Sequence, residues 1–110
     1  MTKEQLRNYR KIKEEHRQIK QRLQALETRK ESEDILGPLR DYYREKLKNL
    51  ADAQLAIELA IDKLDYAERK LIRLRYFDGL PWHRVAVGVH YSEQHTRRLH
   101  GEILQKLKRL

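Results

Sequence analysis

Apolar residues in the first third of the chain recur at alternating spacings of three and four residues. This spacing keeps one stripe of a helix turned toward a partner helix, so it predicts a coiled-coil-like helix from about Thr2 to Glu31. Thr2 and Gln5 form a candidate capping box at its start. The positions of the stripe are Tyr9, Ile12, His16, Ile19, Leu23 and Leu26.

The same pattern returns after a break expected at Ser32–Pro38, where Gly37-Pro38 is a strong helix-ending pair. It predicts a second helix from about Leu39 to Asp62. Two such helices joined by a short turn favour an antiparallel hairpin, although the stripes would equally serve a coiled coil between chains. The second stripe comprises Tyr43, Leu47, Leu50, Gln54, Ile57, Ile61 and Leu64, and Leu55 and Leu59 are expected to widen it.

From Leu64 onward the pattern predicts three shorter helices. The first follows an N-cap at Asp65 and ends at Asp78-Gly79, the second begins at Leu80-Pro81-Trp82, and Ser92 caps the third. The chain is therefore expected to be all-α, with a helical hairpin or coiled-coil segment over residues 1–63 and a second domain over residues 64–110. The expected inward positions of the three helices are Ala67, Leu71, Leu74 and Phe77, then Val85, Ala86 and Val89, then Thr96, Leu99, Ile103, Leu107 and Leu110.

The spacing of the last two helices fits a helix-turn-helix. Two helices that cross steeply need a small residue at the contact, which Ala86 supplies, and a tight turn, which Val89-His90-Tyr91 supplies. Tyr91, Thr96 and Leu99 fall where apolar contacts would lock the second helix on the first. A generic three-helix bundle would share some of these positions and remains the alternative.

The distribution of charge along the chain indicates what kind of partner the protein binds. The formal net charge is +8, with +5 over residues 1–31, −2 over residues 32–64 and +5 over residues 65–110. Such an excess indicates a polyanionic partner, nucleic acid before an anionic membrane surface, and a basic surface that is merely solvated is the alternative. The negative charge of the middle segment excludes it as a nucleic-acid contact.

Several classes of site are not expected. The chain has no cysteine, which excludes disulfides and thiolate metal sites, and His95 and His100 lie on different faces of one helix without a carboxylate cluster. No nucleophile–base arrangement or phosphate-cradling glycine loop indicates an enzyme or a cofactor. With neither a signal peptide nor a membrane-length apolar run in sight, we expect a cytoplasmic protein.

Residues 64–107 resemble region 4 of sigma-70-type transcription factors. The residues that carry the resemblance are Tyr76-Phe77-Asp78-Gly79-Leu80, Val85-Ala86, Tyr91-Ser92 and Arg97-Arg98-Leu99-His100. Two positions depart from that family's pattern: His90 stands where the turn usually has glycine, and Val87-Gly88 replaces polar helix formers. The layout of a basic coiled-coil segment before a region-4-like module resembles phage and prophage late-gene regulators of the ArpU/RinA type.

The resemblance implies a double-stranded DNA contact. The last helix would present Glu93, Gln94, His95 and Arg98 to base edges in the major groove. Phosphates would be met by Arg84, Arg97 and the Ser92-capped helix terminus. Trp82 is expected to be a packing anchor rather than a DNA contact.

We therefore expect a sequence-specific transcriptional regulator, acting as a homodimer because one recognition helix gives little specificity. A phage DNA-packaging protein of the small-terminase kind is the alternative, since such proteins also join a helix-turn-helix to helical oligomerisation segments. RNA polymerase is a further candidate partner, because region 4 docks on the polymerase flap.

Overall fold

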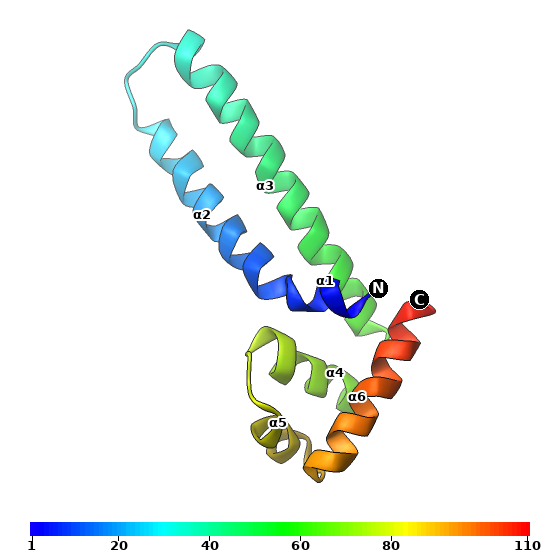
Figure 1. The fold of residues 1–110 in the computed structure, drawn as a ribbon. Coiled ribbons are helices and arrows are strands. Elements are labelled where there is room, and N and C mark those ends of the chain that lie inside the picture. Colours follow the sequence, from blue (N-terminus) through cyan, green and yellow to red (C-terminus); the bar gives the residue numbers. More distant parts are fainter. The chain divides into compact units, whose positions relative to one another are not determined.

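The computed structural model describes all residues, 1–110, and every regular element is helical. The prediction of an all-α chain is thus confirmed. In order, the elements are α1 (Lys3–Arg7), α2 (Tyr9–Glu27), α3 (Glu33–Asp62), α4 (Tyr66–Ile72), the π-helix η1 (Arg73–Phe77), α5 (Trp82–Val89) and α6 (Glu93–Lys108) (Figure 1).

The helices group into two compact units. The first unit contains Met1–Arg10 and Ala56–Leu110, and the second contains Lys11–Leu55. This grouping differs from a division at residue 63, because the start of the chain and the end of α3 share a core with the C-terminal helices. The first unit carries fourteen Lys and Arg against eight Asp and Glu, a net charge of +6, and the second has eleven against nine, a net charge of +2.

The second unit is an antiparallel helical hairpin within one chain. Its segments of α2 and α3 run side by side (Figure 1), and Lys46 Nζ of α3 lies 3.5 Å from Glu15 Oε1 of α2. Ile19, Leu26 and Leu36 are its most buried side chains. The predicted stripe of the first helix is thus covered, within this unit, by α3 of the same molecule.

The turn between these helices lies earlier than the sequence predicted. Helix α2 ends at Glu27, not Glu31, and α3 begins at Glu33 rather than Leu39, so Gly37 and Pro38 lie inside a helix. Proline interrupts helices partly by clashing with the residue before it. Here that residue is a glycine without Cβ, which relieves part of the clash. The break therefore falls at residues 28–32, where Ser32 O accepts from the N–H groups of Ile35 and Leu36.

Two leucines expected to widen the stripe of α3 do not face a core. Leu55 is 53% exposed and Leu59 55% exposed, whereas Ile57 and Ile61 of the same helix are buried. The predicted widening was wrong because one row of apolar residues is enough to cover a single partner helix. Leu55 and Leu59 lie beyond the edge of that row.

The beginning of the chain belongs to the first unit. Thr2 and Gln5 form the predicted capping box, but Asn8 interrupts the expected continuous helix and separates α1 from α2. Tyr9 stacks on Phe77 with ring centroids 3.7 Å apart and donates a hydrogen bond to Glu58 at 2.6 Å. The amino terminus donates to Leu107 O at 2.9 Å.

Helix α4 and η1 form one continuous helical run in this unit. Asp65 caps α4 as predicted, and Glu68 completes a capping box by accepting from the Asp65 N–H. The run widens into a π-helix at Arg73, which the sequence pattern did not predict. Its core also includes side chains outside the predicted face: Ile72 and Tyr76, with Leu6 from α1.

Two neighbouring positions on α3 test which face is buried. Ile61 is fully buried and Leu59 is largely exposed. Ile61→Ala should lower the free energy of unfolding by about 2–4 kcal/mol, because it removes buried methyl groups and leaves a cavity. Leu59→Ala should change it by less than about 0.5 kcal/mol. Urea denaturation measures both, and equal losses would contradict the assignment of the buried face.

Candidate nucleic-acid interface

The helices α5 and α6 meet at a left-handed turn. His90 has φ 63° and ψ 36°, the conformation that glycine usually supplies. Its N–H donates to Val87 O, and the Tyr91 N–H donates to Ala86 O at 3.1 Å. The chain therefore accepts a left-handed histidine at the position where the region-4 pattern has glycine.

Small residues let α5 lie close to its neighbours. Ala86 is 5% exposed, as expected for the crossing point. At Gly88 a Cβ would lie 2.5 Å from Leu74 Cδ1, so the missing side chain makes room for η1. Helix α5 runs unbroken through Val89, although Val87-Gly88 replaces the polar helix formers of the region-4 pattern.

Two hydrogen bonds with Ser92 hold the first turn of α6 in place. Ser92 Oγ accepts from the His95 N–H at 3.1 Å, and the fully buried Thr96 hydroxyl donates to Ser92 O at 2.8 Å. Two predicted inward positions are wrong: Tyr91 is 40% exposed and Leu110 50% exposed. Tyr91 instead meets His95 edge-on with ring centroids 4.5 Å apart, and Leu110 lies past the last helical turn.

The outer face of α6 presents a row of polar residues opposite its buried side. At 100° per residue, Gln94, Arg98, Gly101 and Gln105 fall within a narrow sector, and all four are exposed. The buried Thr96, Ile103 and Leu107 point the other way. His95 is half-buried at one border of the row, where its Nδ1 lies 2.7 Å from Arg98 Nη2.

The other border of this row carries Glu93 and Arg97, which form an ion pair at 3.3 Å. The Arg97 guanidinium also lies over the Trp82 ring, 5.6 Å from its centroid. Arg84 and Ser92 are exposed, on α5 and at the α6 cap. The structure thus brings the seven predicted contact residues to α5, the turn and the first turns of α6.

A buried polar pair, missed by the sequence analysis, joins η1 to α6. The Tyr76 hydroxyl lies 2.6 Å from His100 Nε2, and both residues are less than 10% exposed. Burial lowers the pKa of His100 to about 4, with the nearby cations Lys3, Arg75 and Arg7 adding to the shift. Burial also raises the pKa of Tyr76. Near neutral pH a protonated phenol therefore faces a neutral imidazole, and the two share one hydrogen bond.

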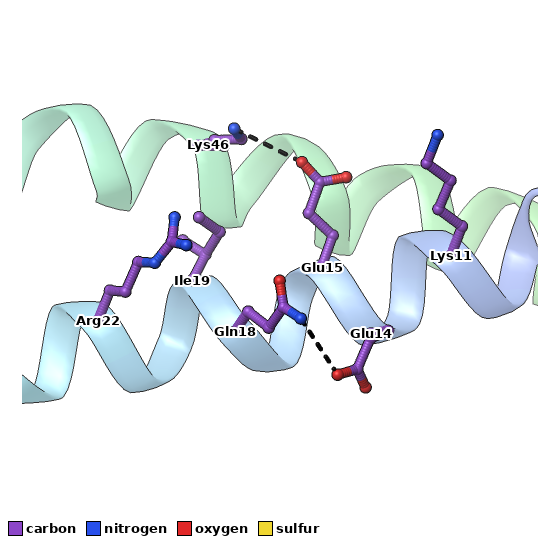
Figure 2. Close-up of a pocket in the computed structure, with 7 residues that line it drawn as sticks. All are labelled: Lys11, Glu14, Glu15, Gln18, Ile19, Arg22 and Lys46. Carbon is purple, nitrogen blue, oxygen red and sulfur yellow. Dashed lines mark hydrogen bonds and ion pairs between the residues drawn. The ribbon is translucent and has the colours of Figure 1, made fainter.

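A groove on the hairpin does not offer a comparable site. It has a volume of about 370 Å³ and lies along α2, where the cations Lys11 and Arg22 are mixed with the acid Glu14 and the neutral Gln18 (Figure 2). Its carboxylates already form ion pairs in the same unit: Glu15 pairs with Lys46, and Glu14 pairs with Arg17. A mixed and internally paired surface of this kind selects neither an anion nor a cation.

Comparison with known proteins gives a family for the chain. Residues 2–109 match the family described as "Protein of unknown function (DUF722)". The chain belongs to this family. No curated protein and no solved structure matches it.

Two structural features of this DUF722 member concern membranes and metal ions. None of its helices combines the length and the apolar character needed to cross a bilayer. No cluster of three or more His, Asp or Glu side chains is arranged to hold a metal ion.

The pair of Tyr76 and His100 predicts a loss of stability in acid. Because the pKa of His100 is about 4 in the folded chain and 6.5 in the reference state, the unfolded chain binds a proton first as the pH falls. The free energy of unfolding should therefore be fully present above pH ~6.5 and decrease between ~6.5 and ~4, by at most about 3 kcal/mol from this group.

The variant His100→Gln separates this effect from other acid-sensitive groups. Glutamine does not titrate and its amide oxygen can accept from the Tyr76 hydroxyl. Urea denaturation at several pH values should show a smaller decline for this variant than for the wild type. The same decline in both proteins would refute the assignment to His100.

Proposed function

We propose that the protein is a sequence-specific binder of double-stranded DNA that inserts α6 into the major groove. The observation that carries the proposal is the exposed row of Gln94 and Arg98 on a helix whose opposite face is buried on α5 through a left-handed turn. Side chains of these two types read adenine and guanine edges by paired hydrogen bonds. A helix held in this way can enter a groove without losing its own packing.

The cations beside the row are of the kind that bind the phosphates of the DNA backbone. Arg97, at the border of the row on α6, and Arg84 of α5 are exposed cations, and phosphate contacts from such side chains fix the register of a protein on the duplex. The net charge of +6 on the unit that carries α5 and α6 supports the same partner. Glu93, paired with Arg97, would orient that arginine or accept from a cytosine amine.

In biological terms, we propose a transcriptional regulator similar to sigma-70 region 4, of phage or prophage type. It would act in the cytoplasm, where its DNA lies, and RNA polymerase is a second proposed partner. A homodimer is also proposed, although within the second unit the stripe of α2 is occupied by α3. Sedimentation equilibrium would separate a dimer from the larger ring expected of a packaging protein, and a monomer would contradict both.

The two neighbouring arginines of α6 test the placement of the helix. Arg98→Ala should relax the preference at one or two base positions, with a loss of about 1–3 kcal/mol of discrimination. Arg97→Ala should weaken binding to all duplexes alike and flatten the slope of log affinity against log salt by about one unit. Selection from a random duplex pool, followed by salt titrations, measures both effects.

Both side chains are exposed, so each variant should retain the circular dichroism spectrum of the wild type. An unchanged sequence profile for Arg98→Ala would show that this face of α6 does not read bases. Absence of any duplex binding by the wild type would overturn the proposed function itself.

Gly101 provides an independent test of the proposed interface, because no packing contact within the protein requires a glycine at this position. A Cβ at this position would meet no atom within 4 Å, and glycine inside a helix costs roughly 0.5–1 kcal/mol relative to alanine. We expect Gly101→Ala to stabilise the fold by that amount and to weaken duplex binding by about 1–2 kcal/mol, the scale of steric overpacking. Denaturation and fluorescence anisotropy measure the two effects. Full duplex affinity in the stabilised variant would remove Gly101 from the interface.

A further inference from the structure

A basic hollow lies within the first unit, beside the helix-turn-helix. Its volume is about 340 Å³, and its cations are Lys3, Arg7, Arg10 and Arg75. Trp82 and His100 form part of its wall. The hollow therefore joins the beginning of the chain to α5 and α6, two parts that the sequence pattern assigned to separate domains.

Local geometry brings the four cations together. Lys3 and Arg7 of α1 and Arg10 of α2 stand on the two sides of the break at Asn8, and all three line the hollow. The Arg10 guanidinium lies against Gly79, whose φ of 71° and missing side chain leave room for it. Arg75 is held by a hydrogen bond from its Nη1 to Leu80 O at 3.0 Å.

No acidic side chain in the lining of the hollow neutralises its positive charges. No carboxylate lines it, and the ion pair of Arg7 with Glu4 is long, at 4.0 Å, and exposed to solvent. The low pKa of His100 has the same origin in part, because Lys3, Arg75 and Arg7 all disfavour its protonation. Like charges gathered in one concave surface focus a positive potential and attract an anion.

We propose that this hollow binds a phosphate group of the DNA backbone and so extends the contact of the duplex beyond α5 and α6 to the N-terminal residues Lys3, Arg7 and Arg10. This inference rests on the proposed function. Its link to the recognition helix is Trp82, since the guanidinium of Arg75 lies 4.5 Å from the centroid of that ring and the guanidinium of Arg97 lies 5.6 Å from it.

The wall of the hollow favours a phosphate over a base. A base would need a free aromatic face for stacking. The Trp82 ring is already covered by Arg75 and Arg97, and His100 meets its edge with centroids 4.6 Å apart. What remains available is positive charge with several N–H donors, which suits phosphate oxygens.

The test removes two charges from the hollow and compares salt dependence. Arg7→Gln/Arg10→Gln should reduce the slope of log affinity against log salt by about one unit, since the hollow holds one phosphate and each neutralised phosphate contributes about 0.9. The preference among duplex sequences should be unchanged, because backbone contacts carry no base information. Arg7→Lys/Arg10→Lys keeps the charges and should keep the slope.

The matched control is Lys63→Gln/Arg109→Gln, which removes two exposed charges from the same unit outside the hollow. Its slope should stay within about half a unit of the wild type. If the wild type binds duplex DNA and the Arg7/Arg10 variant keeps the wild-type slope, the hollow proposal is overturned while the proposed function stands. If the wild type binds no duplex, both fall.

A second measurement distinguishes a DNA phosphate from a free one. Trp82 is the single tryptophan of the chain, so its fluorescence reports on the wall of the hollow. Duplex DNA should change this fluorescence in the wild type and much less in Arg7→Gln/Arg10→Gln. A saturable response to inorganic phosphate, with no response to duplex, would assign the hollow to a free ligand and overturn the proposal.

Discussion

The left-handed conformation of His90 is the constraint on which the geometry of α5 and α6 depends. A continued right-handed helix would carry Ser92 and the residues after it along the axis of α5, away from Val85 and Ala86. The reversal at φ 63° instead lets the Tyr91 N–H close the end of α5 on Ala86 O, after which Ser92 starts a new helix in a different direction. This conformation costs a non-glycine residue roughly 1–2 kcal/mol. The packing of Val85, Val89 and Thr96 offsets that cost, because all three are buried in this arrangement.

Once α6 is fixed on its buried side, its polar side is fixed too. Thr96, Ile103 and Leu107 have no freedom to rotate outward, so Gln94 and Arg98 are held in the opposite direction without contacts of their own to the core. Pre-organisation of this kind lowers the entropy lost on binding. The Arg98 side chain remains adaptable, since it is exposed and its hydrogen bond is to the imidazole of His95.

The sequence predicted best the helix caps and the inward residues of the short helix α5. The inward residues Val85, Ala86 and Val89 are buried, and the caps at Thr2, Asp65 and Ser92 are formed. Boundaries were predicted less well. Gly37-Pro38 was taken as a break, yet a helix can include proline when the residue before it lacks a Cβ, a condition that a breaker rule does not weigh.

The sequence predicted the residues of the candidate site that are close together along the chain. It missed those that only the tertiary fold brings together. Residues of α5 and α6 could be assigned because a helix-turn-helix is local in sequence. Tyr76 and His100 are 24 residues apart, and Arg7 and Arg75 lie in different predicted domains, so no periodicity relates them. A signal was nevertheless present: Lys3, Arg7 and Arg10 follow one another at spacings of four and three, and a histidine on the inward side of α6 needs a polar partner.

The two parts of the proposed DNA surface meet at a single aromatic ring. Trp82 begins α5, and its ring lies under the guanidinium groups of Arg75 from η1 and Arg97 from α6. Sequence analysis assigned it to packing, and its half-buried position with three side-chain neighbours agrees with that assignment. Packing and binding are nevertheless not alternatives at this position. A rigid ring that holds one arginine on each of two elements sets the distance between the cations, and the repeat distance of DNA phosphates is equally fixed. A flexible aliphatic side chain at position 82 would fill the same volume but leave that spacing undefined.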